Sequence, residues 1–284
     1  MLAALARSVR NSIVGGQRWA VQISGAARVR REVRGQTFSN YVRSASRACQ
    51  WYVSAEYAYV REENFNAQSW IRATGQRPHE TSASVDCFVA TPSVRDAPGV
   101  RSAKRGESRE CASLINGVHR GLDLFRPYTA SFLQSRLDDQ AWGAKPDWWP
   151  RVYGWEDYYV VEERGRIVAC AGLWERGRHV REVCRNLKTG EQETKEFGAL
   201  LDFGWAPGRE DAMARLIRHL LGVTARLGRS RLMAPIEHWP RLRDLLSDIP
   251  STPDRRVVLW WSYMPGRDGR SIVLRKPDTD LVYW

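Results

Sequence analysis

The stretch YYVVEERGRIVACAGLW, residues 158–174, contains two runs of apolar and aromatic residues separated by a short polar segment. Residues 158–162 and 166–174 have the composition of β-strands, and Glu163, Arg164 and Gly165 are residues that a tight connection favours. The pattern therefore predicts a β-hairpin, and the rest of the chain is interpreted outward from it.

Downstream, strand-like runs at 180–185 and 200–203 are expected to continue the sheet. Apolar positions then recur at helical spacing and predict one long amphipathic helix that Gly228 ends. These positions are Met213, Leu216, Ile217, Leu220, Leu221, Thr224 and Leu227. A strand at 231–235, a helix at 239–247, and a terminal hairpin of 257–263 with 271–274 are expected to follow.

Upstream of the hairpin, residues 107–116 and 132–137 have helical patterns, and the segment between 90 and 106 has no periodicity. We place the main domain boundary in that irregular segment. The expected units are residues 1–95 and 96–284.

The first unit has a strand at 20–29, a basic turn, a helix at 39–50, a strand at 57–60, and a helix that begins at Asn64. The second unit repeats this order of elements, which indicates an internal duplication. The first copy lacks the front elements that the second copy has.

The basic turn of the first unit contains Arg30, Arg31, Arg34 and Gly35. Arginines beside a helix N-terminus supply charge and unpaired N–H groups that can hold a pyrophosphate, and glycine permits close approach. An anion site is one interpretation of this turn, and an ordinary basic helix start is the other.

With these segments in place, the chain resembles the GNAT N-acetyltransferase superfamily, as two tandem GNAT-like units with a truncated first copy. Residues 158–174 resemble the second and third strands of the family, and 107–137 resemble its front helices. The resemblance implies an α/β (α+β) fold with a mixed, mostly antiparallel sheet flanked by helices.

The resemblance also implies acetyl-CoA as the acyl donor. The segment from Val29 through Arg34 to Ser39 looks like the end of the fourth strand and the cofactor loop, and Asn64 matches the asparagine near the pantetheine arm. The implied cofactor-binding residues are Val29, Arg34, Gly35, Gln36, Thr37, Phe38, Ser39 and Asn64. Thr37 and Ser39 replace small glycines of the family, and Ile71 replaces its tyrosine acid.

In the second copy, Arg209 could face a phosphate, whereas Glu210 and Asp211 would repel one. We therefore expect the pyrophosphate in the first copy.

Acetyl transfer to an amine requires a base and often an acid for the thiolate. Glu182 is the candidate base, with pairing to a neighbouring arginine as the other interpretation, and Tyr263 is the candidate acid or a packed aromatic residue. Asp202 is a second carboxylate on an expected central strand. His119 is interpreted as a surface histidine or, alternatively, a base.

The chain has 284 residues and a net charge of +12, and only five of its 44 basic residues are lysine. One interpretation of this balance is an anionic partner. The other is that arginine is simply the residue used wherever the surface needs a solvated cation. Nine arginines in the first 47 residues make nucleic-acid binding a third possible function. It is ranked last, because no RNA motif or recognition helix accompanies them. The five cysteines show no C-x-x-C spacing, so no metal site is expected.

No apolar run reaches the roughly 20 residues of a membrane span, and no basic segment precedes the apolar residues 2–6, so a cytoplasmic protein is expected. The expected function is transfer of an acetyl group from acetyl-CoA to a small-molecule or peptide amine. The alternative is a degenerate tandem that binds CoA or a partner without turnover.

Overall fold

The computed structural model describes residues 3–29, 55–61, 79–91, 97–138, 153–178, 182–185, 189–262, 274 and 277. The chain divides into two compact units. The first comprises residues 1–84, 121–127 and 255–284, and the second comprises 85–120 and 128–254. The chain passes from one unit to the other within two strands, β4 (His79–Val89) and β12 (Ser251–Ser262), and at both ends of the segment 121–127.

The first unit is built from strands in the order β1-β2-β3-β12. Its remaining strands are β1 (Ala3–Val14), β2 (Gln17–Val29) and β3 (Ala55–Arg61). Gly15 and Gly16, with φ of 55° and 77°, form the two-residue turn between β1 and β2, which requires positive φ at both positions. β2 and β3 are parallel, and β3 and β12 are antiparallel. The predicted strands at 20–29 and 57–60 are confirmed.

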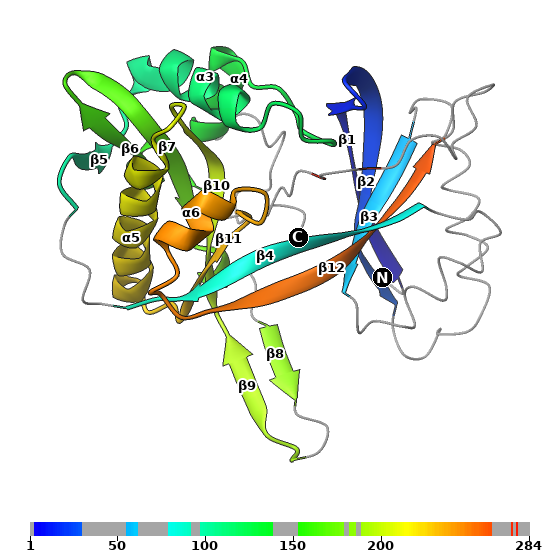
Figure 1. Ribbon diagram of the computed structural model, residues 1–284. Coiled ribbons are helices and arrows are strands. Elements are labelled where there is room, and N and C mark those ends of the chain that lie inside the picture. The colour runs from blue at the N-terminus through cyan, green and yellow to red at the C-terminus, as the bar shows by residue number, and fades with distance from the viewer. Residues whose placement is uncertain are drawn as a thin grey trace. The chain divides into compact units, whose positions relative to one another are not determined.

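The second unit contains strands in the order β4-β11-β10-β7-β6-β5 (Figure 1). Their bounds are β5 (Val100–Ser102), β6 (Tyr158–Glu163), β7 (Arg166–Trp174), β10 (Phe197–Trp205) and β11 (Arg231–Ala234). All neighbouring strands are antiparallel except β10 and β11, which helix α5 (Glu210–Arg226) connects. The predicted hairpin at 158–174 and the predicted fold class, a mostly antiparallel sheet flanked by helices, are confirmed.

Helices cover both faces of this sheet. Strand β7 shows this, because its successive side chains point to opposite faces. On one face, the Cys170 thiol lies 3.7 Å from the carbonyl oxygen of Cys111 in α3. On the other face, Ala169 and Ala171 belong to the apolar cluster that α5 covers. The helices are α3 (Ser108–Val118), α4 (Ala130–Leu137), α6 (Pro240–Leu245) and the short 3-10 turns η3 (Arg105–Glu107), η4 (Trp155–Asp157) and η5 (Arg176–Arg178).

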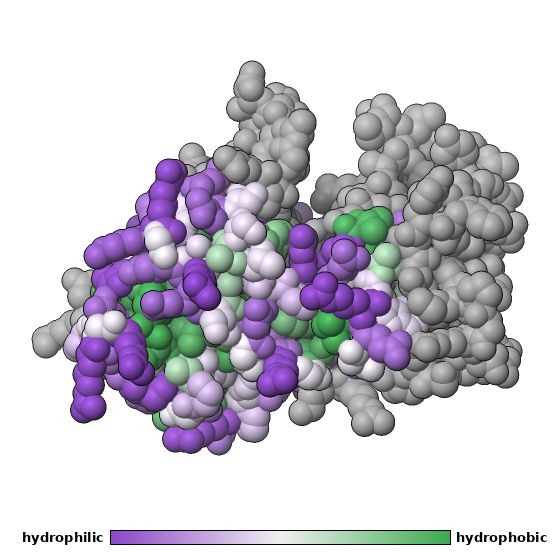
Figure 2. All heavy atoms as spheres, turned by 90° about the horizontal axis from the view of Figure 1, so that it is seen from above, coloured by the Kyte–Doolittle hydropathy of each residue, from purple (hydrophilic) through white to green (hydrophobic). Residues whose placement is uncertain are grey.

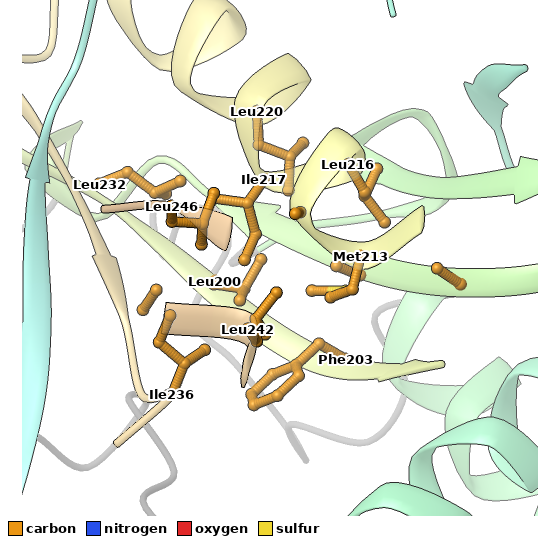
Figure 3. Packing of buried hydrophobic residues seen from close by; sticks show 14 of the residues in the cluster. Leu200, Phe203, Met213, Leu216, Ile217, Leu220, Leu232, Ile236, Leu242 and Leu246 are labelled. Atoms are coloured by element: carbon orange, nitrogen blue, oxygen red, sulfur yellow. The ribbon is translucent and has the colours of Figure 1, made fainter. Parts of the chain in front are cut away.

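The apolar core of the second unit lies between α5 and the sheet (Figure 3). The helical spacing predicted for 213–227 places one face of α5 on β10, and Gly228, with φ of 73°, ends the helix. The labelled residues in the figure come from β10, from α5, and from the stretch that runs from β11 to the residue after α6; they are Leu200, Phe203, Met213, Leu216, Ile217, Leu220, Leu232, Ile236, Leu242 and Leu246.

One expected strand lies elsewhere. β8 (Glu182–Arg185) pairs with β9 (Gln192–Lys195) in a separate two-stranded sheet, and this hairpin extends from the rest of its unit (Figure 1). The expectation that residues 180–185 continue the main sheet is therefore wrong. The partner strand QETK is too polar to be recognised as a strand from its sequence.

Several expected elements fall outside the described residues. These are the basic turn, the helices at 39–50 and 64–75, and residues 271–273 of the terminal hairpin. The other strand of that expected hairpin is β12, which pairs with β3 from Arg256 to Ser262.

The face shown in Figure 2 is mostly hydrophilic over the described residues, with small apolar groups between the charged side chains. The large apolar side chains exposed there or elsewhere in the described chain are Val9, Val183, Leu227 and Leu245. Among the described helices, none combines the length and the apolar character needed to cross a membrane.

Arg101 joins three elements of the second unit and makes its stability sensitive to acid. Its guanidinium lies 2.5 Å from Glu107 in η3 and 2.6 Å from Glu162 in β6. The hydrogen bond from Arg101 is the main reason that the pKa of Glu107 lies below its ordinary value of 4.5. A carboxyl whose pKa is lower in the folded state stabilises that state above its unfolded pKa, and this contribution is lost as pH falls through the folded pKa.

We therefore expect the free energy of unfolding to decrease below about pH 4.5, and Glu107→Gln to decrease this loss. Urea denaturation followed by circular dichroism at pH 7 and pH 3 measures both effects. Asp244→Asn, at an exposed position of α6, is the matched control. Equal acid sensitivity of Glu107→Gln and the wild type would contradict the assignment.

Candidate functional site

Strand β10 carries a β-bulge in the middle of the sheet of the second unit. Leu201 pairs with Gly172 and Gly204 pairs with Cys170, so Asp202 and Phe203 together oppose one residue of β7. Asp202 has a φ of 48°, a left-handed conformation that is unfavourable for a side chain with a Cβ. Such strain persists only where the surrounding structure enforces it, and it concentrates at functional sites.

The surroundings of Asp202 enforce this conformation. Its Oδ2 lies 2.8 Å from Nε of Arg136 in α4, and the two side chains are only 3% and 7% exposed. The Tyr128 hydroxyl donates to Oδ1, and the Tyr158 hydroxyl donates to the backbone oxygen at 2.7 Å. Burial, the largest cause, raises the pKa of Tyr158 well above 10.0, so this phenol keeps its proton. Asp202 is thus held through both its side chain and its backbone.

The next residue of the bulge is held by a histidine. The Phe203 carbonyl oxygen lies 3.1 Å from Nε2 of His119, so this nitrogen carries a hydrogen that it donates. The His119 ring lies 4.8 Å from that of Phe203 and 5.3 Å from that of Trp239. His119 is buried, and the interpretation as a surface histidine is therefore wrong. It is the residue that follows α3, and it packs against β10 through Phe203.

Gly204 completes the bulge because it lets α3 approach the strand closely. A Cβ built at Gly204 would lie 2.4 Å from the Ile115 nitrogen and 2.5 Å from the Leu114 carbonyl carbon. Asp202 is therefore fixed by α4 and β6, and Phe203 and Gly204 are fixed by α3 and the residue that follows it. This part of β10 is thus held by contacts on its side chains and on its backbone.

On its other edge, β10 separates from β11. The two parallel strands pair only from Phe197 to Ala199, and β11 ends at Ala234. Trp239, at the start of α6, lies 5.5 Å from the Phe203 ring and 5.4 Å from the Trp205 ring. The bulged end of β10 thus packs against the Trp239 side chain beyond the point where its pairing with β11 stops.

The turn from β10 into α5 is not suited to a pyrophosphate. Arg209 Nη2 lies 2.5 Å from Glu163, and its Nε lies 3.2 Å from Asp211. Hydrogen bonds from Arg209 and Arg215 lower the pKa of Glu163, so this carboxylate stays charged. Glu210 and Asp211 occupy the first turn of α5. Their negative charges would repel an anion that the partial positive charge of the helix N-terminus attracts. The charge of Arg209 is already balanced by carboxylates.

The predicted site residues do not come together in the described structure: they lie in different elements or outside the described residues. Glu182 begins β8 and pairs in register with Lys195, in a sheet separate from the one that holds Asp202. Val29 is the last residue of β2. Tyr263, which follows β12, lies outside the described residues, as do Asn64 and the loop residues Arg34, Gly35, Gln36, Thr37, Phe38 and Ser39. Their roles stay predictions.

Sequence reasoning missed Arg136 and Tyr128. Arg136 lies on the buried face of α4 between Leu133 and Leu137, and an arginine at the apolar positions of a helix was the available signal. Tyr128 is fixed because Asn116 bonds its backbone nitrogen and its backbone oxygen, both at 2.8 Å. In the described residues, no group of three histidine, cysteine or acidic side chains has a metal-binding arrangement.

Comparison with known proteins gives likeness in structure but not in sequence. The sequence matches no family model and no curated protein. Yeast (Saccharomyces cerevisiae) N-myristoyltransferase with bound myristoyl-CoA aligns with a TM-score of 0.60 and 11% identity over 92% of this chain and 64% of that one. A GCN5-related N-acetyltransferase from Sphaerobacter thermophilus aligns with a TM-score of 0.53 and 18% identity, over 93% and 78% of the two chains.

The chain has the GCN5-related N-acetyltransferase (GNAT) fold. A second GCN5-related N-acetyltransferase, from Kribbella flavida, aligns with a TM-score of 0.54 and 14% identity over 92% of this chain and 57% of its own length. The chain spans 64% of the length of the yeast N-myristoyltransferase. The GNAT fold expected from residues 158–174 and 107–137 is therefore confirmed, whereas the tandem arrangement with a truncated first copy stays a prediction.

Proposed function

We propose that the protein is an acyl-CoA-dependent N-acyltransferase that moves an acetyl group from acetyl-CoA to a small-molecule or peptide amine. The observation that carries the proposal is the likeness over more than nine-tenths of the chain to structures named as N-acetyltransferases and an N-myristoyltransferase. The strained bulge at Asp202, fixed from three elements, supports a functional role for this end of the sheet.

In the proposed reaction, the amine nitrogen attacks the thioester carbonyl carbon, the carbon–sulfur bond breaks, and CoA leaves as a thiolate that takes up a proton. The amine loses its extra proton to a base. Glu182 is the proposed base and Tyr263 the proposed acid. Glu182→Gln and Tyr263→Phe are expected to decrease the rate of transfer without removing donor binding, as thiol release and calorimetry measure.

We propose that the donor binds the first copy through Val29, Arg34, Gly35, Gln36, Thr37, Phe38, Ser39 and Asn64. The acidic turn before α5 supports this choice, because Glu210 and Asp211 disfavour a pyrophosphate there while Glu163 and Asp211 neutralise Arg209. Arg34 would pair with a phosphate oxygen, and Gly35 would permit close approach of the backbone.

Calorimetric titration with acetyl-CoA tests the donor site. Arg34→Ala is expected to weaken binding about tenfold or more, because a charge-assisted hydrogen bond to phosphate is lost. Arg18→Ala, an exposed arginine of β2, is the matched control and should bind as the wild type does. Absence of binding by the wild type at millimolar acetyl-CoA would contradict the enzyme proposal, and normal binding by Arg34→Ala would contradict the proposed loop.

The second candidate function is binding of CoA or a partner without turnover. It is supported by Ile71, which stands where the family has its tyrosine acid, and by Asp202, whose carboxylate is paired with Arg136. Release of free thiol from acetyl-CoA, measured with a panel of primary amines, separates the two functions. Acetyl-CoA binding without amine-dependent thiol release would favour the binding function.

A further inference from the structure

A tyrosine hydroxyl is buried without a hydrogen-bond partner next to the bulge. Tyr153 is 1% exposed, and its hydroxyl oxygen has no hydrogen-bond partner among the residues that the structure describes. Its ring lies on Gly172 of β7, where an added Cβ would be 2.4 Å from Cε2 of the ring. Because Cε2 is bonded to the carbon that carries the hydroxyl, the polar end of the ring lies over the strand.

Two other phenols near this position already donate their protons. The Tyr128 hydroxyl donates to Asp202 Oδ1, and the Tyr158 hydroxyl donates to the Asp202 backbone oxygen. The rings of Tyr153 and Tyr158 have their centroids 6.4 Å apart. Of these three phenols, Tyr153 is therefore the one whose hydroxyl hydrogen has no acceptor among the described residues. A buried donor without an acceptor is unfavourable, and native structures keep few of them.

The register of the strands places this donor close to the strained backbone. Gly172 pairs with Leu201 of β10, the residue before Asp202, and with Tyr158 of β6. Cys170, two residues away on the same side of β7, faces α3. Tyr153 thus lies on the α3 side of the sheet, beside the residue where the bulge begins.

We propose that the Tyr153 hydroxyl donates a hydrogen bond to a carbonyl oxygen of a bound substrate. A carbonyl fits better than a charged group, because the nearby charges of Arg136 and Asp202 already compensate each other. This inference rests on the proposed function, in which two carbonyl groups are available. One is the thioester carbonyl of acetyl-CoA, and the other is an amide carbonyl of the amine acceptor.

The inference predicts opposite effects of one substitution on stability and on binding. Tyr153→Phe removes only the hydroxyl, so we expect the Tm of the free protein to be unchanged or to rise by about 2–4 °C. Tyr158→Phe removes a hydroxyl that has an acceptor and is expected to lower the Tm. Differential scanning calorimetry measures both. A lower Tm for Tyr153→Phe would show that its hydroxyl has a partner in the free protein and would overturn the inference.

Binding and kinetics distinguish the two carbonyl groups. If the thioester is bound, Tyr153→Phe weakens acetyl-CoA about three- to tenfold and leaves CoA, which lacks the carbonyl, unchanged. If the acceptor is bound, the same variant raises KM about three- to tenfold for glycinamide and not for ethylamine. Either result supports the proposal.

Two results would contradict it in different ways. Wild-type values for Tyr153→Phe with all four probes would overturn the inference alone, leaving a buried water molecule as the partner. A wild-type chain that neither binds acetyl-CoA nor releases thiol would contradict the proposed function and the inference together.

Discussion

Replacing Arg136 with methionine is expected to lower the free energy of unfolding by about 3–5 kcal/mol, because it leaves the buried Asp202 carboxylate without its cation. Methionine retains much of the arginine stem, so the loss reports the charge more than the packing. Urea denaturation at pH 7, followed by circular dichroism, measures the change.

An exposed arginine supplies the control for this prediction. Arg105 lies 3.2 Å from Asp138, but its side chain is 75% exposed, so Arg105→Met should cost less than about 1 kcal/mol. Adding Asp202→Gly to Arg136→Met should recover part of the loss, because glycine removes the buried carboxylate and accepts a φ of 48°. Similar losses for the two arginine variants would contradict the role given to the buried pair.

Replacing Gly204 with alanine is expected to lower the free energy of unfolding by about 3 kcal/mol, because the new Cβ meets backbone atoms of α3. The nearest atoms belong to Ile115 and Leu114 at 2.4–2.5 Å, and a backbone cannot move aside as a flexible side chain does. Thermal unfolding measures the loss. The change should also weaken acetyl-CoA binding or transfer if the bulge is part of the site.

Gly117, inside α3, is the matched control for Gly204. A Cβ at Gly117 would have no atom within 4 Å, so Gly117→Ala should stabilise the protein by about 0.5–1 kcal/mol through helix propensity. A neutral effect of Gly204→Ala would show that α3 and β10 separate easily. The bulge would then be less constrained than the contacts of residues 202–204 indicate.

Sequence patterns predicted the elements whose buried face is apolar. The helix α5 and the β6–β7 hairpin have uninterrupted periodicity, so their type and bounds followed from local residues. Strand β1 was not recognised because its buried face includes Arg10 and Ser12, which hide the alternation expected of a half-buried strand. Arg10 is buried there because it donates to the Tyr57 hydroxyl and the Leu124 carbonyl oxygen.

The contacts that build the site are distant in sequence, which limits what a pattern can show. Asp202 was recognised as a carboxylate on a central strand, but its partners Arg136 and Tyr128 come from segments more than 60 residues earlier. Nothing local distinguishes Arg136 from the other arginines except its apolar neighbours in α4. The bulge itself depends on how β10 pairs with β7, which residues 200–203 alone do not specify.

The division of the first unit between distant segments has a consequence for synthesis on the ribosome. β3 ends at Arg61, and its partner in β12 begins at Arg256, whereas residues 85–254 contain every segment of the second unit. At about 5–20 residues per second, roughly 10–40 s pass between the translation of these two strands. During that interval β3 lacks its β12 partner, and an unpaired strand edge can pair with strands of other nascent chains.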